Sequence, residues 1–530
     1  MTKRWENVGS LYQIYPRSYQ DTDGDGIGDL RGITSRLAYI EKLGIDAVWI
    51  SPFFPSPQTD FGYDVSDYRD IDPTFGTLDD FRSLLTEAHA RNIKVMIDLV
   101  PCHSSDQHEW FKESRSSRDN SKRDYYVWRD ANLDGSPPNN WLSLAGGSSW
   151  TFDETTGQYY LHSFLTTQPD LNWDNPVVRQ EMTDVVRYWF DMGVDGLRVD
   201  AIWGISKDPE FGDDSPNHEH QGDPSVYGAF VHDHCKYGPN FDKYLHELAS
   251  VCDEFDDKQI VFEFYPDERL GDVYDQYAKV AHVHSKASVF FMEYRQNHWH
   301  AADVMSSIDR YANYSTANAK PFFCLGNHDQ PRVVSRLGEA RARALNFLNL
   351  TTSGISVVYY GDEIGMENAE LEQHEIQDSF SPASSIFDSR DLERTPMQWD
   401  STEFGDFSTA KPWLPVHRNR QNVNVSAQSK KADSMLEMHR SLLKLRQAHP
   451  LLVHGTLERV DVRNGFVVSF KREYNRQRAY ILVNFSSETE QIKLPEPCNI
   501  IATTHNWSSL GLGLNIKLPA YFGILAVAVD

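Results

Sequence analysis

The sequence lacks the features that define several protein classes. Its longest apolar runs, at 355–360 and 524–529, are far shorter than the roughly 18 residues that a membrane-spanning helix needs. The N-terminal residues are polar and aromatic where a signal peptide would have its apolar stretch, so we expect a cytoplasmic protein. The five cysteines are odd in number and form no C-x-x-C pair, which argues against a disulfide framework and favours reduced thiols (Cys102, Cys235, Cys252, Cys324 and Cys498).

Positive charge is also scarce. The chain has 51 Lys and Arg against 77 Asp and Glu, and its formal net charge is -26. This excess opposes binding to nucleic acid or to anionic membranes, and no basic stretch offsets it. The motifs G-x-x-x-x-G-K-[ST], G-x-S-x-G and H-E-x-x-H are missing as well. We therefore expect no nucleic-acid or membrane partner, and the sequence does not support a nucleotide-binding, serine-hydrolase or zincin site; the oligomeric state stays open.

The chain does contain a regular alternation of strand-like and helix-like segments. Hydrophobic residues make up 40% and charged residues 24%, which is typical of globular proteins. Parallel strands need crossover connections, so the pattern predicts a (β/α)₈ barrel with long insertions, with a doubly wound sheet as the alternative. The eight short β-branched or aromatic runs are 11–15, 45–51, 93–100, 196–200, 260–263, 289–292, 321–325 and 355–360.

Composition changes along the chain predict three domains. Residues 1–103 and 171–450 are expected to form the barrel, with a lid-like insertion at about 361–432. The stretch 104–170, rich in Trp, Asp, Asn, Ser, Gly and Pro, is predicted to be a small inserted domain B after the third strand. From 451 to 530 the pattern becomes alternation, with a hairpin turning at 474–477, which indicates an antiparallel β-sandwich, domain C.

Polar residues stand at the ends of several predicted strands. In a (β/α)₈ barrel the chemistry lies at the carboxyl ends of the strands, so these positions are candidates for function. Any one of them alone is more simply explained as a structural polar group, but their convergence at five strand ends favours a site. The residues are Asp98 and His103, Arg198 and Asp200, Glu263, Asn327, His328 and Asp329, and Asp362.

Such carboxyl groups can cleave a glycosidic bond. One carboxylate attacks the sugar while a second, protonated carboxyl gives its proton to the departing oxygen. Arg198 lies two residues before Asp200, on the same face of its strand, where it can hydrogen-bond Asp200 and hold it ionised. The acid must keep its proton near neutrality, so its pKa must be raised. Carboxylates alone could equally bind a metal ion, and on the residues alone this alternative stays open.

Four motifs at these strand ends point to one family. They are Asp98-Leu-Val-Pro-Cys-His103, Gly196-Leu-Arg-Val-Asp200, Glu263 after Ile260-Val-Phe, and Asn327-His328-Asp329. Together they resemble the four conserved regions of the α-amylase superfamily, glycoside hydrolase family 13. Two further motifs, Gln168-Pro-Asp-Leu-Asn172 and Arg394-Thr-Pro-Met-Gln-Trp-Asp400, resemble its α-glucosidase and oligo-1,6-glucosidase branch. The resemblance covers nearly the whole chain.

This resemblance implies a role for each matching residue. Asp200 would be the nucleophile, Glu263 the general acid/base, and Asp329 the carboxylate that grips sugar hydroxyls. The implied reaction is retaining hydrolysis through a β-glucosyl-enzyme, with the two working carboxyls about 5 to 5.5 Å apart. Glu293 is the nearest competitor for the role of acid. The implied substrate-binding residues are Asp60, Tyr63, His103, Phe164, Gln168, Arg198, Ala201 and His328.

Three positions bear on how closely the family pattern applies. Phe262 precedes the acid where the family usually has a small residue, and Cys102 precedes His103 where it usually has Asn. Neither change removes a catalytic atom. Ala201 follows the nucleophile, and in this branch Ala, Thr or Gly there resembles enzymes that cleave α-1,4 links, whereas Val resembles enzymes that cleave α-1,6 links.

We therefore expect an exo-acting α-glucosidase that releases glucose from maltose and short α-1,4-linked malto-oligosaccharides. The alternatives are an oligo-1,6-glucosidase and a transglucosylating or isomerising relative of the trehalose synthase or sucrose isomerase type. A non-catalytic sugar-binding protein is the remaining alternative, which the retained Asp200, Glu263 and Asp329 disfavour.

An acidic, glycine-rich turn near the N-terminus suggests a metal ion. Its alternating carboxylates have the spacing that wraps oxygen ligands around Ca²⁺, but Gly32 stands where an EF-hand needs Glu. The resemblance implies a structural Ca²⁺, with Mg²⁺ as the alternative, held by Asp21, Asp23, Asp25, Asp29 and the backbone carbonyl of Ile27.

The segment 208–240 contains a group of histidines that could indicate zinc. Spacings of two place the pairs on one face only if the chain is extended, and no cysteine pair completes a ligand set. We therefore do not predict a transition-metal site from His218, His220, His232 and His234.

Overall fold

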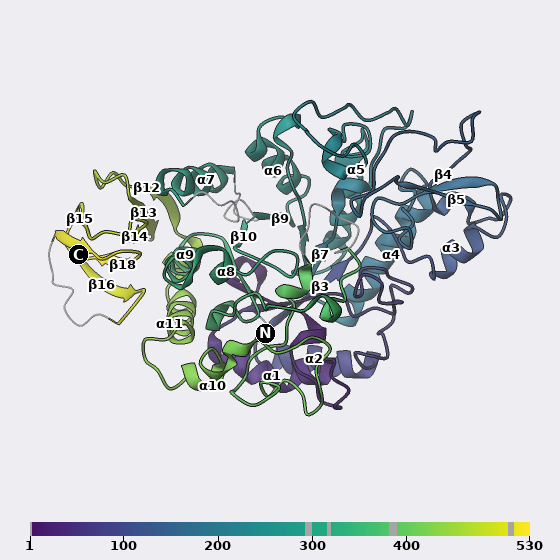
Figure 1. Cartoon of the computed structure of the whole chain (residues 1–530). Helices are drawn as coiled ribbons and strands as arrows, with labels where there is room; N and C mark the ends of the chain where they lie inside the picture. The colour runs from purple at the N-terminus through teal and green to yellow at the C-terminus, as the bar shows by residue number, and fades with distance from the viewer. Residues whose placement is uncertain (1–2, 292–298, 315–319, 381–388, 507–513, 530) are drawn as a thin grey trace.

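The computed structural model describes residues 3–291, 299–314, 320–380, 389–506 and 514–529. It places a β-barrel at the centre, a small sheet with α3 on one side, and the C-terminal sheets on the opposite side (Figure 1). Glu293 and the end of the predicted strand 289–292 lie outside the described residues. Within the described part of the chain, no helix has both the length and the apolar character needed to cross a membrane.

Eight parallel strands form a closed barrel, in the order β1-β11-β10-β9-β8-β7-β3-β2. This confirms the predicted fold class and excludes the doubly wound sheet. Every residue of these strands is buried, because helices cover the outside while side chains fill the interior. The strands are β1 (Ser10–Ile14), β2 (Ala47–Ile50), β3 (Lys94–Leu99), β7 (Gly196–Val199), β8 (Gln259–Phe262), β9 (Ala287–Phe291), β10 (Phe322–Cys324) and β11 (Ile355–Tyr359).

The helices begin and end at residues whose side chains or backbone suit those positions. Thr77 and Asp80 form a capping box at the start of α2, and Asp29 accepts a hydrogen bond from the Gly32 amide at the start of α1. Gly44 ends α1 with φ 93°, a conformation that glycine adopts without strain. The helices around the barrel are α1 (Leu30–Leu43), α2 (Leu78–Ala90), α4 (Pro176–Met192), α5 (Phe241–Ser250), α6 (Val273–Ala281), α7 (Ala301–Tyr314), α8 (Val333–Leu337), α9 (Glu339–Thr351) and α11 (Met435–Ala448).

A small three-stranded sheet, in the order β4-β6-β5, interrupts the barrel between β3 and α4. Backbone bridges between His103 and Asp170 and between Tyr126 and Leu171 join the two chain segments where this insertion leaves the barrel. The insertion therefore begins and ends beside the carboxyl end of β3. Its elements are α3 (Glu109–Ser114), β4 (Trp128–Arg129), β5 (Trp150–Asp153) and β6 (Gln158–Leu161).

The long segment after β11 is mostly irregular and contacts the loop after β1. The backbone amide of Met397 donates to the Ser18 carbonyl, and that of Trp413 donates to the Gly26 carbonyl. Its one α-helix among the described residues is α10 (Val425–Gln428). The segment thus packs on the carboxyl-end face of the barrel, where polar residues gather.

The C-terminal part forms a five-stranded antiparallel sheet, β12-β13-β14-β18-β16, and a two-stranded sheet, β15-β17. The predicted hairpin is confirmed, because Tyr474 pairs with Gln477 and the two residues between them both have positive φ, as a type I′ turn requires. The elements are α12 (Pro450–His454), β12 (Thr456–Arg459), β13 (Val467–Tyr474), β14 (Gln477–Asn484), β15 (Glu490–Lys493), β16 (Cys498–Thr503), β17 (Asn515–Leu518) and β18 (Gly523–Ala528).

The barrel closes between its first and last strands, and a buried arginine of α11 reinforces this closure. Arg446 donates to the carbonyls of Gly9, just before β1, and of Gly354, just before β11. It also donates to the carbonyls of Leu350 and Thr352 at 2.9 and 2.8 Å. A single side chain therefore links α11 to both strands that complete the barrel.

Candidate active site

A cavity of about 490 Å³ opens at the carboxyl ends of the barrel strands. Eight of the predicted site residues line it: Asp60, Tyr63, His103, Phe164, Asp200, Ala201, Glu263 and Asp329. Gln168, Arg198 and His328 are buried just behind this lining and contact it. The structure thus brings together all the residues predicted for catalysis and substrate binding, although they come from distant parts of the chain.

A buried arginine joins three carboxyl groups at the base of the cavity. Arg198 Nη1 donates to Asp98 Oδ1 at 2.5 Å and to Asp200 Oδ1 at 2.6 Å. Its Nη2 lies 2.6 Å from Glu263 Oε1, in an ion pair. The Trp49 indole N–H donates to the other oxygen of Asp98 at 2.6 Å. One fully buried guanidinium therefore fixes the positions of both predicted working carboxyls.

Burial and charge set the proton balance of this cluster. Burial raises the pKa of Asp200 well above its usual range; Arg198 opposes this rise, and the negative charges of Glu263 and Asp98 add to it. Burial likewise raises the pKa of Asp98 to about 6, although Arg198 and Trp49 favour its charged form. The two aspartates therefore hold protons more readily than isolated carboxylates do, and the contact with Arg198 does not by itself hold Asp200 ionised, as the sequence had led us to expect.

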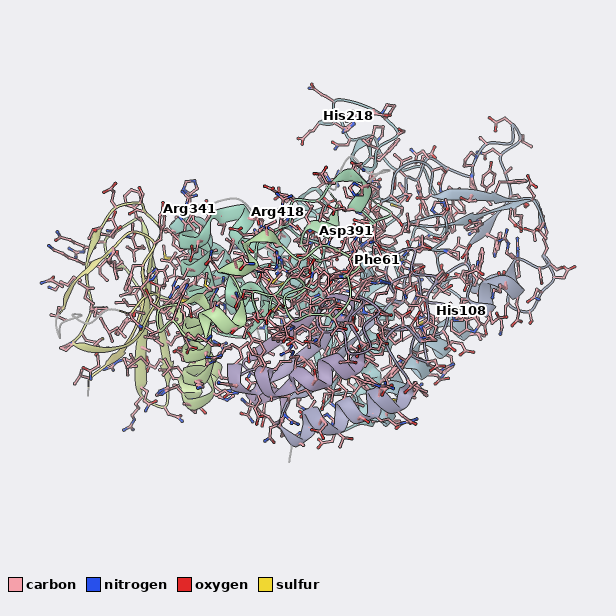
Figure 2. All side chains as sticks on the ribbon, turned by 60° about the horizontal axis from the view of Figure 1, so that its bottom comes forward. Phe61, His108, His218, Arg341, Asp391 and Arg418 are labelled. Carbon is pink, nitrogen blue, oxygen red and sulfur yellow. The ribbon has the colours of Figure 1, made fainter. Side chains whose placement is uncertain are left out.

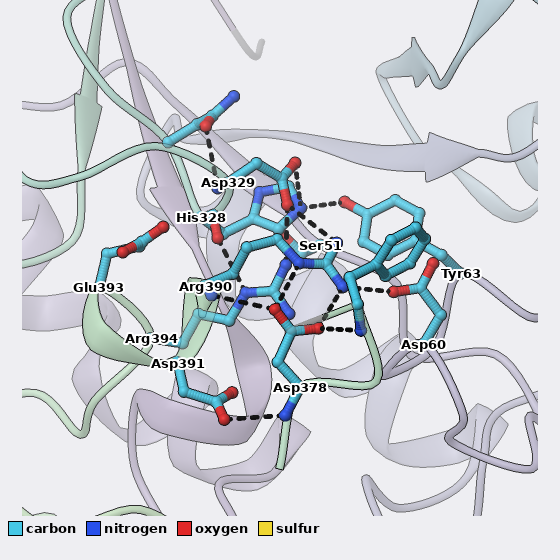
Figure 3. Close-up of polar contacts among 12 residues, drawn as sticks. Ser51, Asp60, Tyr63, His328, Asp329, Asp378, Arg390, Asp391, Glu393 and Arg394 are labelled. Carbon is cyan, nitrogen blue, oxygen red and sulfur yellow. Dashed lines mark hydrogen bonds and ion pairs between the residues drawn. The ribbon is translucent and has the colours of Figure 1, made fainter. Parts of the chain in front are cut away.

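Asp329 lies in a more positive environment, as Figure 3 shows. Its Oδ1 accepts a hydrogen bond from Arg394 Nη2 at 2.7 Å and lies 3.4 Å from Arg390 Nη1. Burial opposes ionisation of Asp329, but its contact with the His328 ring and the positive charges of Arg394 and Arg390 outweigh burial and hold the pKa of that carboxyl well below its usual range. Asp329 is therefore a fixed negative charge, suited to accept hydrogen bonds from sugar hydroxyls.

Both predicted histidines are buried and neutral. Burial lowers the pKa of His328 well below its usual value and that of His103 to about 4. Gln13 Nε2 lies 2.8 Å from His328 Nδ1, while the Tyr63 hydroxyl lies 2.7 Å from His328 Nε2. Neutral imidazoles in fixed orientations can bind sugar hydroxyls without adding charge beside the carboxyls.

One wall of the cavity is held by a network of hydrogen bonds around Arg390, which the sequence did not predict. Arg390 Nη2 donates to Asp60 Oδ1 at 2.9 Å and to Asp378 Oδ1 at 2.7 Å, and Arg390 Nε donates to Asp378 Oδ2 (Figure 3). Gln168 Nε2 donates to the other oxygen of Asp60 at 2.9 Å. These hydrogen bonds connect three distant chain segments at this wall, and they hold Arg390 beside Asp329.

Several further residues of the lining were not predicted. Four of them, Trp203, Tyr227, Lys236 and Tyr237, come from the long connection between β7 and α5. The sequence of this connection has no periodicity from which the positions of its side chains could be predicted. The connection does follow the strand that ends at Asp200, and this location indicated that it could contribute to the site. The other unpredicted lining residues are Leu144, Tyr265, Gln330, Phe380 and Arg390.

Ala201 has an unusual backbone conformation directly after Asp200. Its φ is 44° and its ψ 43°, in the left-handed region that residues other than glycine rarely adopt. In this conformation its backbone N–H donates to Glu263 Oε2 at 3.1 Å. The strained turn therefore aims an amide at the predicted acid, and it leaves only a methyl group at the cavity wall.

The acidic turn near the N-terminus brings some of its carboxylates together. One carboxylate oxygen from each of Asp21, Asp23 and Asp29 lies within 4.8 Å of the other two. Asp25 instead accepts a hydrogen bond from the Ile27 amide at 2.7 Å. Three of the four predicted carboxylates therefore lie close together, and the metal site itself stays a prediction.

Two buried carboxyls joined by one guanidinium, at the carboxyl end of a (β/α)₈ barrel, are an arrangement that can cleave a glycosidic bond. The family model described as the alpha amylase catalytic domain matches residues 13–455. The chain belongs to this family, the α-amylase superfamily known as glycoside hydrolase family 13.

Relatives over nearly the full length agree with this assignment. The chain is 41% identical to a probable alpha-glucosidase of Rhizobium meliloti, with 98% of this chain and 97% of the relative covered. It is 35% identical to an oligo-1,6-glucosidase of Parageobacillus thermoglucosidasius, covering 94% and 93%. The crystal structure of an alpha-glucosyl transfer enzyme, XgtA, superimposes with a TM-score of 0.92 at 35% identity and covers both chains completely.

Proposed function

We propose that this chain is an exo-acting, retaining α-glucosidase that releases glucose from the non-reducing end of maltose and short α-1,4-linked malto-oligosaccharides. The observation that carries the proposal is the cavity itself. Asp200 and Glu263 share Arg198 at its base, and the ion pair of Arg390 and Asp60 lies in its wall. In the proposed binding mode this wall stops the terminal sugar unit beside the two carboxyls, and the rest of the substrate extends toward the opening.

The proposed reaction has two steps. Asp200 attacks the anomeric carbon while Glu263 gives its proton to the departing glycosidic oxygen, so that a β-glucosyl-enzyme and a shortened sugar result. Water then attacks the same carbon, Glu263 takes a proton from it, and glucose leaves with its α configuration retained. Arg198 orients both carboxyls, and Asp329 and His328 hold hydroxyls of the bound glucosyl unit.

A transglucosylating enzyme is the second candidate function. Four side chains from the connection between β7 and α5 line the cavity, and three of them are aromatic (Trp203, Tyr227 and Tyr237, with Lys236). Aromatic faces of this kind can hold an acceptor sugar in place of water. The structural similarity to a glucosyl transfer enzyme supports this candidate.

Product analysis separates these functions. The purified protein is incubated with maltose, isomaltose, sucrose and trehalose, with Asp200→Asn as the control. Glucose released from maltose and absent in the control is the result expected for an α-1,4-glucosidase. Preferential cleavage of isomaltose would indicate an oligo-1,6-glucosidase, and a rearranged disaccharide with little free glucose would indicate a transferase or isomerase.

Replacement of Ala201 by Val should lower kcat/KM for maltose by about tenfold and raise the ratio of isomaltose to maltose cleavage. A β-branched side chain is strained in the left-handed conformation of this residue, and it fills space beside the reacting bond. Initial rates with both disaccharides provide the measurement. Ala201→Gly, which suits the conformation and adds no bulk, should keep the maltose preference. An unchanged ratio in Ala201→Val would dismiss this position as the determinant of linkage.

We also propose that the acidic turn holds a structural Ca²⁺, with Mg²⁺ as the alternative. The neighbouring carboxylates of Asp21, Asp23 and Asp29 support a hard cation, and Asp25, the backbone carbonyl of Ile27 and water would supply its further ligands. Asp21 also accepts a hydrogen bond from Ser408 at 2.6 Å, which connects the turn to the irregular segment after β11. The ion would stabilise this contact and take no part in the chemistry.

Removal of divalent cations with a chelator should therefore lower the melting temperature by several degrees, and added Ca²⁺ should restore it. Asp23→Asn, at an exposed position, should abolish the response to Ca²⁺ while leaving the fold intact. Thermal unfolding followed by circular dichroism measures both effects. A melting temperature that changes neither with chelator nor with added Ca²⁺ would contradict the proposal.

A further inference from the structure

Three potential metal ligands meet in the connection between β7 and α5, outside the catalytic cluster. They are Asp214, His232 and Cys235, and all three side chains are buried. One carboxylate oxygen, the imidazole Nδ1 and the thiol Sγ all lie within 4.8 Å of one another. Only one of the four histidines considered from the sequence takes part, joined by a cysteine and an aspartate that spacing alone did not connect.

The distances within this cluster match a tetrahedral zinc site. His232 Nδ1 lies 3.3 Å from Asp214 Oδ2 and 3.5 Å from Cys235 Sγ. Zinc bonds of about 2.0 Å to nitrogen and oxygen and about 2.3 Å to sulfur, at tetrahedral angles, separate nitrogen from oxygen by about 3.3 Å and nitrogen from sulfur by about 3.5 Å. The His232 nitrogen therefore already lies from the Asp214 oxygen and the Cys235 sulfur at the spacings that one zinc ion would impose, and the third separation is within 4.8 Å.

The surrounding contacts orient these ligands in the same way. His232 Nε2 lies 2.7 Å from the Tyr227 carbonyl and can donate its proton there, which leaves the Nδ1 lone pair directed at the cluster. Asp214 Oδ1 accepts hydrogen bonds from the backbone amides of His234 and Cys235, at 2.8 and 3.2 Å. The other oxygen, Oδ2, is the one that faces His232. Hydrogen bonds of this kind hold metal ligands in place in proteins.

The cluster also borders an apolar core. Cys235 packs in a core with Val127, Trp141, Trp150 and Leu161 of the inserted domain. Burial and the negative charge of Asp214 raise the pKa of Cys235 well above its usual value, so without a metal the sulfur is a protonated thiol. A zinc ion would bind the thiolate and release that proton to solvent.

The other histidines of this connection are placed differently. His218 is exposed and lies at the outer edge of the molecule (Figure 2). His234 Nδ1 is 2.6 Å from Asp208 Oδ2, in a separate ion pair. These residues therefore provide natural controls within the same loop.

We propose that Asp214, His232 and Cys235 bind one Zn²⁺ ion, with water as the fourth ligand, and that the ion fixes the loop that places Tyr227, Lys236 and Tyr237 in the cavity wall. The mixture of nitrogen, sulfur and oxygen ligands favours Zn²⁺ over Ca²⁺ or Mg²⁺. The site is distinct from the N-terminal acidic turn, whose ligands are all oxygen atoms.

The test uses the full chain, freed of metal with a chelator and then titrated with Co²⁺ as a spectroscopic substitute for Zn²⁺. We expect saturation at one ion per chain with the absorption bands of tetrahedral Co²⁺ and a thiolate charge-transfer band, and displacement of these bands by Zn²⁺. Binding at the acidic turn would give no thiolate band. A wild-type spectrum without that band would overturn the proposal, whatever the variants do.

Variants then assign the ligands. Cys235→Ser should remove the thiolate band and weaken Co²⁺ binding by at least about 100-fold. Cys498→Ser, which replaces a buried cysteine of the C-terminal sheet, and His234→Gln should keep both. Zn²⁺ should raise the melting temperature of the wild type and of these two controls, but not that of Cys235→Ser. A band of equal intensity in folded Cys235→Ser would show that another thiol binds the metal and would overturn the assignment.

Discussion

Asp200→Asn should reduce the rate of glucose release from maltose by about 10⁴-fold or more, with little change in stability. The amide has nearly the same shape as the carboxylate, and its oxygen can still accept the hydrogen bond from Arg198 Nη1. It cannot attack the anomeric carbon, so the glucosyl-enzyme does not form. Steady-state kinetics and thermal unfolding of the same preparation measure the two effects.

The control for this variant is Asp461→Asn, at an exposed position where the side-chain oxygen accepts a hydrogen bond from the Arg463 amide. Asparagine can make the same contact, so activity and stability should both match the wild type. A second check uses Asp200→Ala with azide, which can enter the vacated space and give a β-glucosyl azide. Full activity of Asp200→Asn would refute the assignment of the nucleophile.

The loss of activity in Glu263→Gln should depend on the leaving group of the substrate. Cleavage of maltose should fall by about 10³-fold to 10⁴-fold, because the departing sugar oxygen needs a proton that glutamine cannot give. Formation of the glucosyl-enzyme from p-nitrophenyl α-glucoside should fall by less than about tenfold, because nitrophenolate leaves without protonation. Pre-steady-state release of nitrophenol measures this first step separately from hydrolysis of the intermediate.

Glu268→Gln is the matched control, since Glu268 is an exposed glutamate a few residues along the same loop. It should leave both substrates unaffected. Azide should accelerate the second step in Glu263→Gln, because it attacks the intermediate without a general base. Equal losses on both substrates would instead assign Glu263 a role in binding or positioning.

The parts of this protein that could be predicted from its sequence are those governed by periodicity and topology. Each barrel strand is a short apolar run, and parallel strands place their carboxyl ends on one face, so Asp200, Glu263 and Asp329 could be expected to meet. The same argument placed Arg198 beside Asp200, and the structure has them in contact. The hairpin at 474–477 was predictable because alternation and turn geometry are both local.

The remaining parts depend on irregular loops whose paths no local pattern determines. Arg390 contacts Asp60, which lies 330 positions away, and no periodicity connects the two. Cys235 and Asp214 are brought together by a loop with turns and isolated bridges but no long helix or strand, so their spacing in the sequence did not suggest a shared site. The left-handed conformation of Ala201 could not be predicted for another reason: positive φ is expected from the sequence mainly at glycine, and this residue is alanine.

The closure of the barrel between β1 and β11, reinforced by Arg446, also determines when the chain can fold during synthesis. The first strand leaves the ribosome long before its neighbour on the far side exists. About 340 residues separate the end of β1 from the start of β11, so at roughly 5–20 residues per second one edge of β1 stays unpaired for about 17–70 s before β11 has been made. During that interval an unpaired apolar strand edge is open to aggregation. Slower translation lengthens this period, and the yield of folded protein should therefore depend on the rate of synthesis as well as on the stability of the finished barrel.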